Sequence, residues 1–528
     1  MADLACLPYG VGHADEGVCL LLQVGAYNVL LDCGLQDMTP LLVDLRRGLK
    51  LDLVLCSHAH SDHARGLLEL HRHFPRLPIY ASEVTTQLLP LNWLGADPGW
   101  SASFCRALPW RSPLEFCDGL SVELFPAGHL PGAAVFVIKY AGPDGRTHTI
   151  VYTGDCFLSN SRLVDGLPLE ELRGLRPDIL ILEGSYGTAR NPRRRQQEND
   201  LVDRISRALG EQRSVLLPVP TLGLGQELLM LLRSHHQFTG RDVDIWVDGS
   251  VAHGCDAYLT LLPYLPTAVR NFAQHQPLFW DDRVRPHLYR LQTDDQRRAI
   301  ATKPSIVLTD ANQDLHQYIA SDSTRWLVLV PQGWTIPPSL VASVAVEAYL
   351  LADHCDGPST MQLIHNLRPQ HVVFVHGSPN YLADLTSLDE LYSRYQLHVP
   401  RAGVRLELPI GESFQQPSIP DHSYEAELVE LGGEIVVMLP DTIKADSRWQ
   451  SFADTGLLTA RWQGQELVLR SLSQWELLNQ SRSREIPPDM ACCANCNYCR
   501  NQHCWNPASP LYEFKVTLDG LCPAFEHS

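Results

Sequence analysis

Short runs of aliphatic and β-branched residues that end in polar clusters mark the N-terminal part of the chain. Residues 26–32 and 51–56 form two such runs, which predict buried strands, and residues 64–74 then repeat apolar side chains at helical spacing. Further strands of this kind are predicted at 120–127, 149–153 and 179–183. Strands that alternate with helices predict an α/β fold, in which polar side chains at the strand ends form the site.

A second α/β series begins beyond residue 208. Its predicted strands are 214–219, 244–248, 305–309 and 326–330, and its predicted helices are 226–233 and 294–300. Histidines of the kind that bind metal ions follow the first strands and resume only at His354 and His376. We therefore expect this series to be a domain at 208–352 that is inserted into the first one. Residues 1–207 and 353–408 would then form a single domain.

The last part of the chain has a different pattern. Residues 409–488 predict a β-rich region, with strands at 434–439, 456–462 and 466–470 joined by polar loops that contain proline. A separate cysteine-rich module is predicted at 489–528.

The composition is that of a globular protein with several domains. The chain has 528 residues, of which 45% are hydrophobic and 19% charged, and it contains no apolar run of about 18 residues, the length that a membrane helix needs. The first residues lack the basic and then apolar segments of a secretory signal. We therefore expect a cytoplasmic protein without a membrane partner, and the sequence leaves homo-oligomerisation open.

The net charge bears on the choice of partner. It is −18, so an anionic partner such as RNA must be attracted by a local basic patch or by bound metal ions. Arg190, Arg193, Arg194 and Arg195 form a short basic run of this kind. The run has two interpretations, a clamp on phosphates or the solvated start of a helix, and the sequence does not decide between them.

The densest chemical signal lies directly after the strand at 51–56. His58, His60, Asp62 and His63 place three imidazoles and a carboxylate within six positions. Burying such side chains together costs free energy unless a cation compensates them. Imidazole and carboxylate ligands without thiolates favour zinc, although iron and manganese accept the same donors. The loop therefore predicts a metal site.

Two metal ions need more ligands, and later strand ends offer them. His129 follows Gly128, Asp155 ends a Thr-Gly-Asp sequence, and His376 precedes a glycine. The motifs HxHxDH, GH and TGD, in this order and spacing, resemble the metallo-β-lactamase superfamily. The resemblance implies an αββα sandwich that binds two zinc ions. It also assigns the ligands: one ion to His58, His60 and His129, the other to Asp62, His63 and His376, with Asp155 as the bridge.

Other motifs narrow the resemblance. Asp32 matches an early aspartate of the superfamily, which orients the ligands without touching the metal. The sequence Leu182-Glu183-Gly184-Ser185-Tyr186-Gly187 is similar to the acidic motif that precedes a β-CASP insertion. Matching motifs follow in order at 218–227, 245–248, 331–335, 351–354 and 376–377. The resemblance covers about residues 10 to 405.

The resemblance to the β-CASP family also implies a reaction. This family consists chiefly of nucleases, and a histidine at the position of His376 marks its RNA-processing branch, so RNA is the expected partner. The implied chemistry is hydrolysis of a phosphodiester by a hydroxide that bridges two zinc ions. Asp62 would belong to the catalytic set, and His354, kept cationic by Glu183, would protonate the leaving oxygen. The expected enzyme is a zinc-dependent ribonuclease that cuts internally, from the 5′ end, or both.

Two positions depart from the family pattern. Leu224 stands after Gly223 where many relatives have arginine, and leucine cannot contact a phosphate. Residues 308–312 replace a turn that is commonly of Ser-Gly-Met type. We therefore expect an altered nucleic-acid cleft beside an intact set of metal ligands.

Cysteines gather near the end of the chain. Cys496, Cys499, Cys504 and Cys522 are the preferred ligands of a further zinc ion, with Cys492 and Cys493 as alternatives. Zinc is favoured over an iron–sulfur cluster, because the spacing matches no known cluster motif. Modules of this kind often touch single-stranded RNA, on which Tyr498 and Trp505 would stack.

Three alternative functions are open from the sequence. They are a non-catalytic RNA-binding scaffold, a DNA nuclease and a hydrolase of small esters. The complete ligand set argues against the scaffold, and the inserted domain argues against small esters, because a small substrate needs no second wall over the cleft.

Overall fold

The structure is a computed structural model. It describes residues 4–13, 16–93, 104–142, 145–281, 283–300, 303–319, 323–334 and 337–410, four strands between 427 and 471, residues 492–509, and residues 512, 516, 518, 525 and 526. The chain divides into two units, Met1–Ser418 and Ile419–Ser528.

The first sheet of unit Met1–Ser418 has seven strands. In spatial order they are β20 (Leu406–Glu407), β1 (Leu4–Val11), β2 (Val18–Val24), β3 (Tyr27–Leu31), β4 (Leu53–Leu55), β5 (Ile79–Ser82) and β6 (Cys105–Leu108). Neighbours from β20 to β3 are antiparallel, and those from β3 to β6 are parallel.

The second sheet also has seven strands. They are β19 (Gln396–His398), β18 (His371–Val375), β11 (Ile179–Glu183), β10 (Thr147–Tyr152), β9 (Ala134–Ala141), β8 (Leu120–Pro126) and β7 (Leu114–Cys117). The strands from β19 to β10 run parallel, so that the carboxyl ends of β18, β11 and β10 meet at one edge. The remaining pairs are antiparallel.

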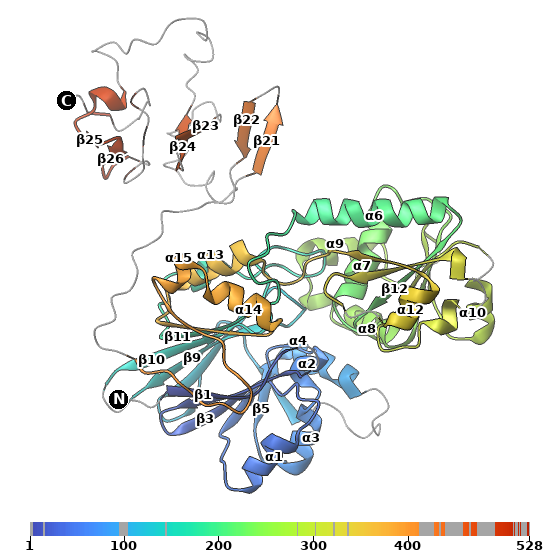
Figure 1. Cartoon of the computed structure of the whole chain (residues 1–528), viewed down its shortest axis with the longest axis horizontal. Coiled ribbons are helices and arrows are strands. Elements are labelled where there is room, and N and C mark those ends of the chain that lie inside the picture. The colour runs from blue at the N-terminus through green and yellow to red at the C-terminus, as the bar shows by residue number, and fades with distance from the viewer. Residues whose placement is uncertain are drawn as a thin grey trace, which may run out of the picture. The chain divides into compact units, whose positions relative to one another are not determined.

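The two sheets pack face to face. Side chains from alternate positions of both, such as Leu20, Leu22, Phe136 and Ile138, form one buried cluster between them. Helices cover the outer faces, as Figure 1 shows for α1 and α3 on one side and α13, α14 and α15 on the other. The helices of this part are α1 (Thr39–Arg46), α2 (Ser61–Ala64), α3 (Leu67–His73), α4 (Glu83–Leu88), η1 (Leu89–Trp93), α5 (Leu169–Leu172), α13 (Gly357–Leu367), α14 (Pro379–Thr386) and α15 (Asp389–Tyr392). The predicted αββα sandwich is confirmed.

A third sheet, with six strands, is parallel throughout. Its order is β14 (His287–Arg290), β13 (Asp244–Val247), β15 (Ile306–Asp310), β12 (Ser214–Val219), β16 (Trp326–Pro331) and β17 (Ala345–Tyr349). Its helices are α6 (Arg194–Gly210), α7 (Leu224–Ser234), α8 (Gly249–Thr260), η3 (Leu262–Tyr264), α9 (Thr267–His275), α10 (Asp294–Ile300), α11 (His316–Ile319), η4 (Ser323–Arg325) and α12 (Pro338–Ser343). The chain leaves the second sheet after β11 and returns to it with β18.

Unit Ile419–Ser528 contains short antiparallel elements. Its four-stranded sheet has the order β21 (Glu427–Leu431), β22 (Glu434–Met438), β23 (Leu458–Gln463) and β24 (Glu466–Ser471). A smaller hairpin, β25 (Cys499–Arg500) with β26 (His503–Cys504), follows η5 (Cys493–Asn495). The three strands expected from the sequence correspond to β22, β23 and β24.

One predicted helix differs from the structure. Residues 64–74 do not form one helix but belong to α2 and α3, which Gly66 separates. The N–H of Gly66 donates to the carbonyl of Cys33 at 2.8 Å, and a Cβ at Gly66 would lie 2.6 Å from the sulfur of Met38. The turn is therefore set by close packing against the loop after β3, which the apolar spacing does not reveal.

Among the described residues, none of the helices combines the length and the hydropathy that a membrane crossing requires.

Candidate metal centre

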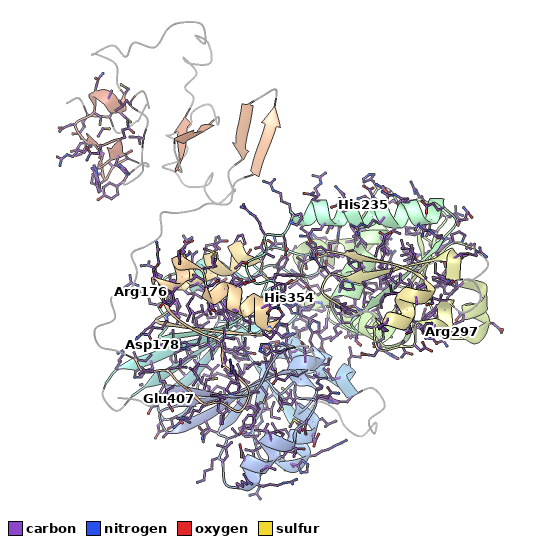
Figure 2. All side chains as sticks on the ribbon, viewed as in Figure 1. Arg176, Asp178, His235, Arg297, His354 and Glu407 are labelled. Atoms are coloured by element: carbon purple, nitrogen blue, oxygen red, sulfur yellow. The ribbon has the colours of Figure 1, made fainter. Side chains whose placement is uncertain are left out.

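Strand ends and the loops behind them bring the predicted ligands together. The loop after β4 carries His58 and His60, and the short helix α2 that follows it carries Asp62 and His63. His129, Asp155 and His376 follow β8, β10 and β18. These side chains form groups whose ligand atoms lie within 4.8 Å of one another. His354 lies where the inserted domain meets the two larger sheets (Figure 2).

The first group contains His58, His60, His129 and Asp155. The Nδ1 atom of His60 lies 3.2 Å from Nε2 of His58 and 3.0 Å from Nε2 of His129. The Oδ2 atom of Asp155 lies 3.5 Å and 3.7 Å from the same two Nε2 atoms. Four ligands at zinc distance around a tetrahedral centre are separated by roughly 3.3 Å, so this group has the dimensions of a zinc site.

The second group contains Asp62, His63 and His376. The Nε2 atom of His376 lies 3.2 Å from Oδ2 of Asp62, and Nε2 of His63 lies 4.0 Å from that oxygen. On the other side, Oδ1 of Asp155 lies 3.3 Å from His63 Nε2. The two carboxylate oxygens of Asp155 therefore face different groups, as a bridging ligand requires.

Two buried polar atoms support a fit to metal ions. Neither Nε2 of His63 nor Oδ1 of Asp155 has a hydrogen-bond partner in the described part of the chain. Buried polar atoms are almost always paired, because leaving one unpaired costs about 1–3 kcal/mol. Here the two atoms lie 3.3 Å from each other, beside candidate ligand atoms of Asp62 and His376, so the donor set suits cations of the zinc type.

Hydrogen bonds behind the rings select which nitrogen faces the centre. The Nδ1–H of His129 donates to the carbonyl of Asp353 at 2.8 Å, and the Nδ1–H of His63 donates to Asp32 at 2.7 Å, which leaves both Nε2 atoms free. The Nε2–H of His60 donates to the carbonyl of Leu222 at 3.2 Å, which leaves its Nδ1 free. Metal-binding histidines commonly have such partners.

The protonation states also suit metal binding. Burial lowers the pKa of His58 well below its ordinary value and that of His60 to about 4, and neighbouring imidazoles act in the same direction. Burial alone would raise the pKa of Asp62 and Asp155, but His63 and His376 outweigh it, and both pKa values are lowered. His58 and His60 are therefore neutral and Asp62 and Asp155 ionised, which are the forms that bind metal ions. Burial alone would lower the pKa of His63 and His376, but Asp155 and other carboxylates raise it, so these two rings must lose a proton when a cation binds.

Asp32 holds several residues of the site in position through hydrogen bonds. Its carboxylate accepts hydrogen bonds from the N–H of Ser57 at 2.6 Å, the hydroxyl of Ser57 at 2.7 Å, His63 and the hydroxyl of Tyr152. Two residues later, a Cβ at Gly34 would lie 1.6 Å from the carbonyl oxygen of Asp62. Only glycine lets this loop pass so close to the metal-binding loop.

A second charged pair lies beside the cluster. The Nδ1–H of His354 donates to Oε2 of Glu183 at 2.8 Å, and the other oxygen of Glu183 accepts from the N–H of Cys156 at 2.7 Å. Burial alone would lower the pKa of His354, but Glu183 and Asp353 outweigh it, so the pKa lies well above its ordinary value. The pair predicted from the sequence is therefore in contact, with a protonated imidazole facing the cluster.

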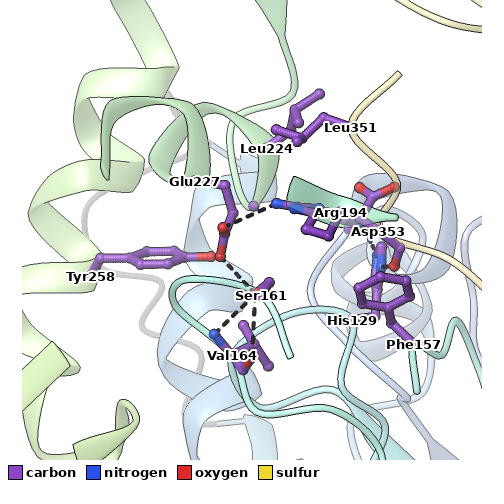
Figure 3. A pocket seen from close by; sticks show the side chains of 12 residues that line it. His129, Phe157, Ser161, Val164, Arg194, Leu224, Glu227, Tyr258, Leu351 and Asp353 are labelled. Atoms are coloured by element: carbon purple, nitrogen blue, oxygen red, sulfur yellow. Dashed lines mark hydrogen bonds and ion pairs between the residues drawn. The ribbon is translucent and has the colours of Figure 1, made fainter. Parts of the chain in front are cut away.

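The inserted domain completes the site from the other side. Leu222 and Gly223, in the loop before α7, lie against His60, and a Cβ at Gly223 would be 3.5 Å from its Nε2. A small cavity of about 20 Å³ lies here, and Leu224, which replaces the family arginine, forms part of its wall together with Leu351. Figure 3 shows this cavity.

Glu227 of α7 links the inserted domain to the αββα sandwich. Its carboxylate accepts hydrogen bonds from Ser161 Oγ at 2.7 Å and from the N–H groups of Arg162 at 3.0 Å and Leu163 at 2.7 Å. Arg194 adds an ion pair at 3.3 Å (Figure 3). Because Glu227 is only 8% exposed, these contacts are shielded from water.

We expect the substitution Glu227→Ala to lower the free energy of unfolding by about 3 kcal/mol, since it leaves the backbone N–H groups of Arg162 and Leu163 without an acceptor and removes one of the partners of Arg194. The urea midpoint of the full chain measures this. Among the described residues, the exposed side chain of Glu211 pairs with Arg213 alone, so Glu211→Ala should change stability by less than about 0.5 kcal/mol. Equal midpoints for the two variants would show that Glu227 does not stabilise the contact between the inserted domain and the sandwich.

The basic run divides into two kinds of residue. Arg194 is held inside, because it also donates to the carbonyl of Ala352 at 2.5 Å and pairs with Glu198. Neither interpretation of the run, a phosphate clamp or a solvated helix start, applies to this residue. Arg190, Arg193 and Arg195 are exposed.

Several residues of the site were not among those predicted. Ser185 Oγ donates to Glu183 and lies 2.9 Å from Nδ1 of His376, and Asp353 O accepts from His129. Asp353 directly precedes His354, and Ser185 lies two residues after Glu183. Their closeness to predicted site residues was the one sequence signal that could have pointed to them. Tyr152 gave none, since it ends an apolar strand like its neighbours.

The predicted tail ligands are only partly described. Cys499 and Cys504 are paired residues of the β25–β26 hairpin, and Cys493 packs with them. No cysteine group with metal-ligand distances occurs among the described residues. Cys522 lies outside the described residues.

The αββα fold and the buried histidine–aspartate cluster define a class, the metal-dependent hydrolases of the metallo-β-lactamase fold. Residues 27–209 match the family model of the beta-lactamase superfamily domain, and residues 344–396 match that of the Zn-dependent metallo-hydrolase RNA specificity domain.

Comparison with curated proteins narrows this class. The chain is 53% identical to protein sll0514 of Synechocystis sp., over 99% of the chain and 97% of that protein. It is 22% identical to Integrator complex subunit 11 of Gallus gallus, over 80% of the chain and 76% of that protein. It is 29% identical to ribonuclease TTHA0252 of Thermus thermophilus, over 51% of the chain and 62% of that protein. The chain belongs to the β-CASP family of the metallo-β-lactamase superfamily and is a hydrolase of that fold.

Proposed function

We propose that this protein is a zinc-dependent ribonuclease that hydrolyses phosphodiester bonds of single-stranded RNA, internally, from the 5′ end, or both. One observation carries the proposal: the two carboxylate oxygens of Asp155 face two separate groups of ligand atoms. The match of residues 344–396 to an RNA specificity domain supports RNA as the substrate, because this segment contains both His354 and His376. The names of the relatives, a ribonuclease among them, support it as well.

Under this proposal one zinc ion is held by His58, His60 and His129, and the other by Asp62, His63 and His376, with Asp155 shared. Zinc ions in such a site activate water for attack and offset the charge of a phosphodiester. Hydrogen bonds hold three of the ligand rings in position. Asp32 accepts from His63, the carbonyl of Asp353 from His129, and the carbonyl of Leu222 from His60.

His354 has the role of proton donor. It is 17% exposed, so its ring is partly open to solvent, while Glu183 is 1% exposed and holds the proton-bearing ring in place. A proton on the imidazole can pass to the leaving oxygen of the RNA, which would otherwise depart as an alkoxide. Asp62 takes part as a ligand that also holds His376 at 3.2 Å.

Removing Asp32 tests the support of the ligands. In Asp32→Ala the Nδ1–H of His63 loses its acceptor, and we expect zinc to bind about 10–100-fold more weakly. Competition with a chromogenic chelator measures this affinity. Asp118 is exposed at the β7–β8 turn, so Asp118→Ala should bind zinc like the unchanged chain. If both variants kept the original affinity, Asp32 would have no positioning role.

We further propose a zinc ion in the tail at Cys496, Cys499, Cys504 and Cys522, near which Tyr498 and Trp505 would stack on RNA. The pairing of Cys499 with Cys504 across the hairpin supports this. A cytoplasmic location is proposed too, because the described cysteines are all free thiols, as a reducing compartment keeps them. Assembly of several copies stays a prediction.

A substrate comparison tests the function. The metal-loaded full chain is offered 5′-labelled single-stranded RNA, the same sequence as DNA, and a small ester, and we expect RNA to be cleaved fastest. Faster cleavage of DNA would make the protein a DNA nuclease, and turnover of the ester alone would make it an esterase. RNA binding without any cleavage would favour the scaffold. Product lengths distinguish internal cutting from release of 5′ nucleotides.

A further inference from the structure

A cavity of about 310 Å³ lies on the inserted domain, apart from the metal cluster. Pro218, Ala311 and Val330 line it, and each lies within one residue of the carboxyl end of its strand, β12, β15 or β16. Parallel α/β sheets bind their ligands at this edge. The volume falls at the lower end of the range for sites that take small organic groups.

The lining of this cavity combines flat apolar walls with polar groups that lack partners. Trp334, Pro337 and Leu340 supply apolar surface. The amide of Gln313 and the ring nitrogens of His316 are exposed at the rim and the indole of Trp334 is half-buried, and none of them makes a hydrogen bond or ion pair within the described part of the chain, so all are available to a ligand. An aromatic ring with unpaired donors and acceptors around it fits a nucleobase, which has a flat face and a hydrogen-bonding edge.

The charge of the lining favours a nucleobase over a phosphate as the ligand of this cavity. The described lining residues include no lysine or arginine, and Asp314 adds a carboxylate. A phosphate would be repelled here, whereas the uncharged edge of a base would not.

The loop from β12 to α7 connects the cavity to the metal cluster. Pro218 lines the cavity, and Gly223, five residues later, lies against His60. Five extended residues span at most roughly 17 Å, so the cavity is within that reach of the cluster. A single strand with one phosphate at the cluster can place a base a few nucleotides away in this cavity.

We propose that the cavity at Trp334 is a nucleobase subsite, which holds one unpaired base of single-stranded RNA while a nearby phosphate lies at the metal cluster. This rests on the proposed ribonuclease function and adds the second point at which the strand is held. The expected contribution is to substrate binding and not to the chemical step, because none of the lining residues belongs to the metal cluster.

The test uses the variants Trp334→Ala and Trp334→Phe of the metal-loaded full chain. Loss of the aromatic face should raise KM for long single-stranded RNA about tenfold with kcat unchanged, since stacking on one aromatic side chain contributes on this scale. Trp334→Phe keeps an aromatic face and should stay near the unchanged chain. KM for bis(p-nitrophenyl) phosphate, which is too short to reach the cavity, should be the same in all three proteins.

A scan with abasic nucleotides locates the base. In the unchanged chain one abasic position, a few nucleotides from the cut, should raise KM, and in Trp334→Ala the same position should have no further effect. If the unchanged chain cuts RNA but Trp334→Ala has the same KM and the same abasic profile, the subsite is overturned and the ribonuclease function stands. If the unchanged chain turns over the small diester but no RNA, both are overturned.

Discussion

Replacing Asp155 by asparagine is expected to lower the rate of the proposed RNA cleavage more than roughly a thousandfold, since removal of a single preorganised hydrogen-bond donor already costs about 10²–10³ in other enzymes. The carboxylate has one oxygen 3.5 Å from His58 Nε2 and the other 3.3 Å from His63 Nε2, and an amide presents only one oxygen. We therefore expect the variant to lose at least one zinc ion as well. Elemental analysis and a cleavage assay on the same sample measure both effects.

The control for this variant is Asp384→Asn, which removes a carboxylate from the exposed face of α14. It should keep its metal content and its activity. Circular dichroism of both variants shows whether the fold is retained. An Asp155→Asn protein that is folded, carries the original amount of zinc and cleaves RNA at the original rate would remove Asp155 from the centre of the site.

Replacing His354 by alanine is expected to slow RNA cleavage by about 10²–10⁴-fold while the zinc content stays the same, because a proton donor contributes to the rate on this scale. The imidazole is bound to Glu183 at 2.8 Å, so Glu183→Gln should lower the rate in the same direction. A substrate whose leaving group needs no proton, such as a p-nitrophenyl diester, should be much less affected by either change.

Metal content makes the test of His354 specific. His354 also lies within 4.8 Å of candidate ligand atoms of His129 and Asp353, so a role as metal ligand is the competing explanation. If His354→Ala lost zinc together with activity, the residue would be a ligand and not the proton donor. His73→Ala, a change on the exposed side of α3, should alter neither quantity.

Much of the metal centre was predictable because its chemistry is concentrated in short segments. Three imidazoles and a carboxylate within the six positions from His58 to His63 have no inexpensive structural explanation, and the later ligands follow predicted strands. Parallel strands place their carboxyl ends at one edge, so His376, far along the chain, still meets Asp155 at 3.4 Å.

The remaining features depend on contacts that no local pattern encodes. Arg194 belonged to a basic run with two interpretations, a phosphate clamp or a solvated helix start. Its pair with Glu198 is local to α6, but its partner Glu227 meets it only when α6 and α7 pack. The support of His60 comes from a backbone carbonyl, that of Leu222, and a carbonyl has no signature in the sequence. The cavity at Trp334 exists only because loops after β15 and β16 converge.

The most direct test of the account is a titration of the metal-depleted full chain with zinc, followed by cleavage of 5′-labelled single-stranded RNA. The account predicts no cleavage before zinc is added, activity that rises with zinc, and a parallel titration of Asp155→Asn that stays flat. RNA cleavage by the metal-depleted chain in the presence of excess chelator, at the rate of the zinc-loaded chain, would contradict it.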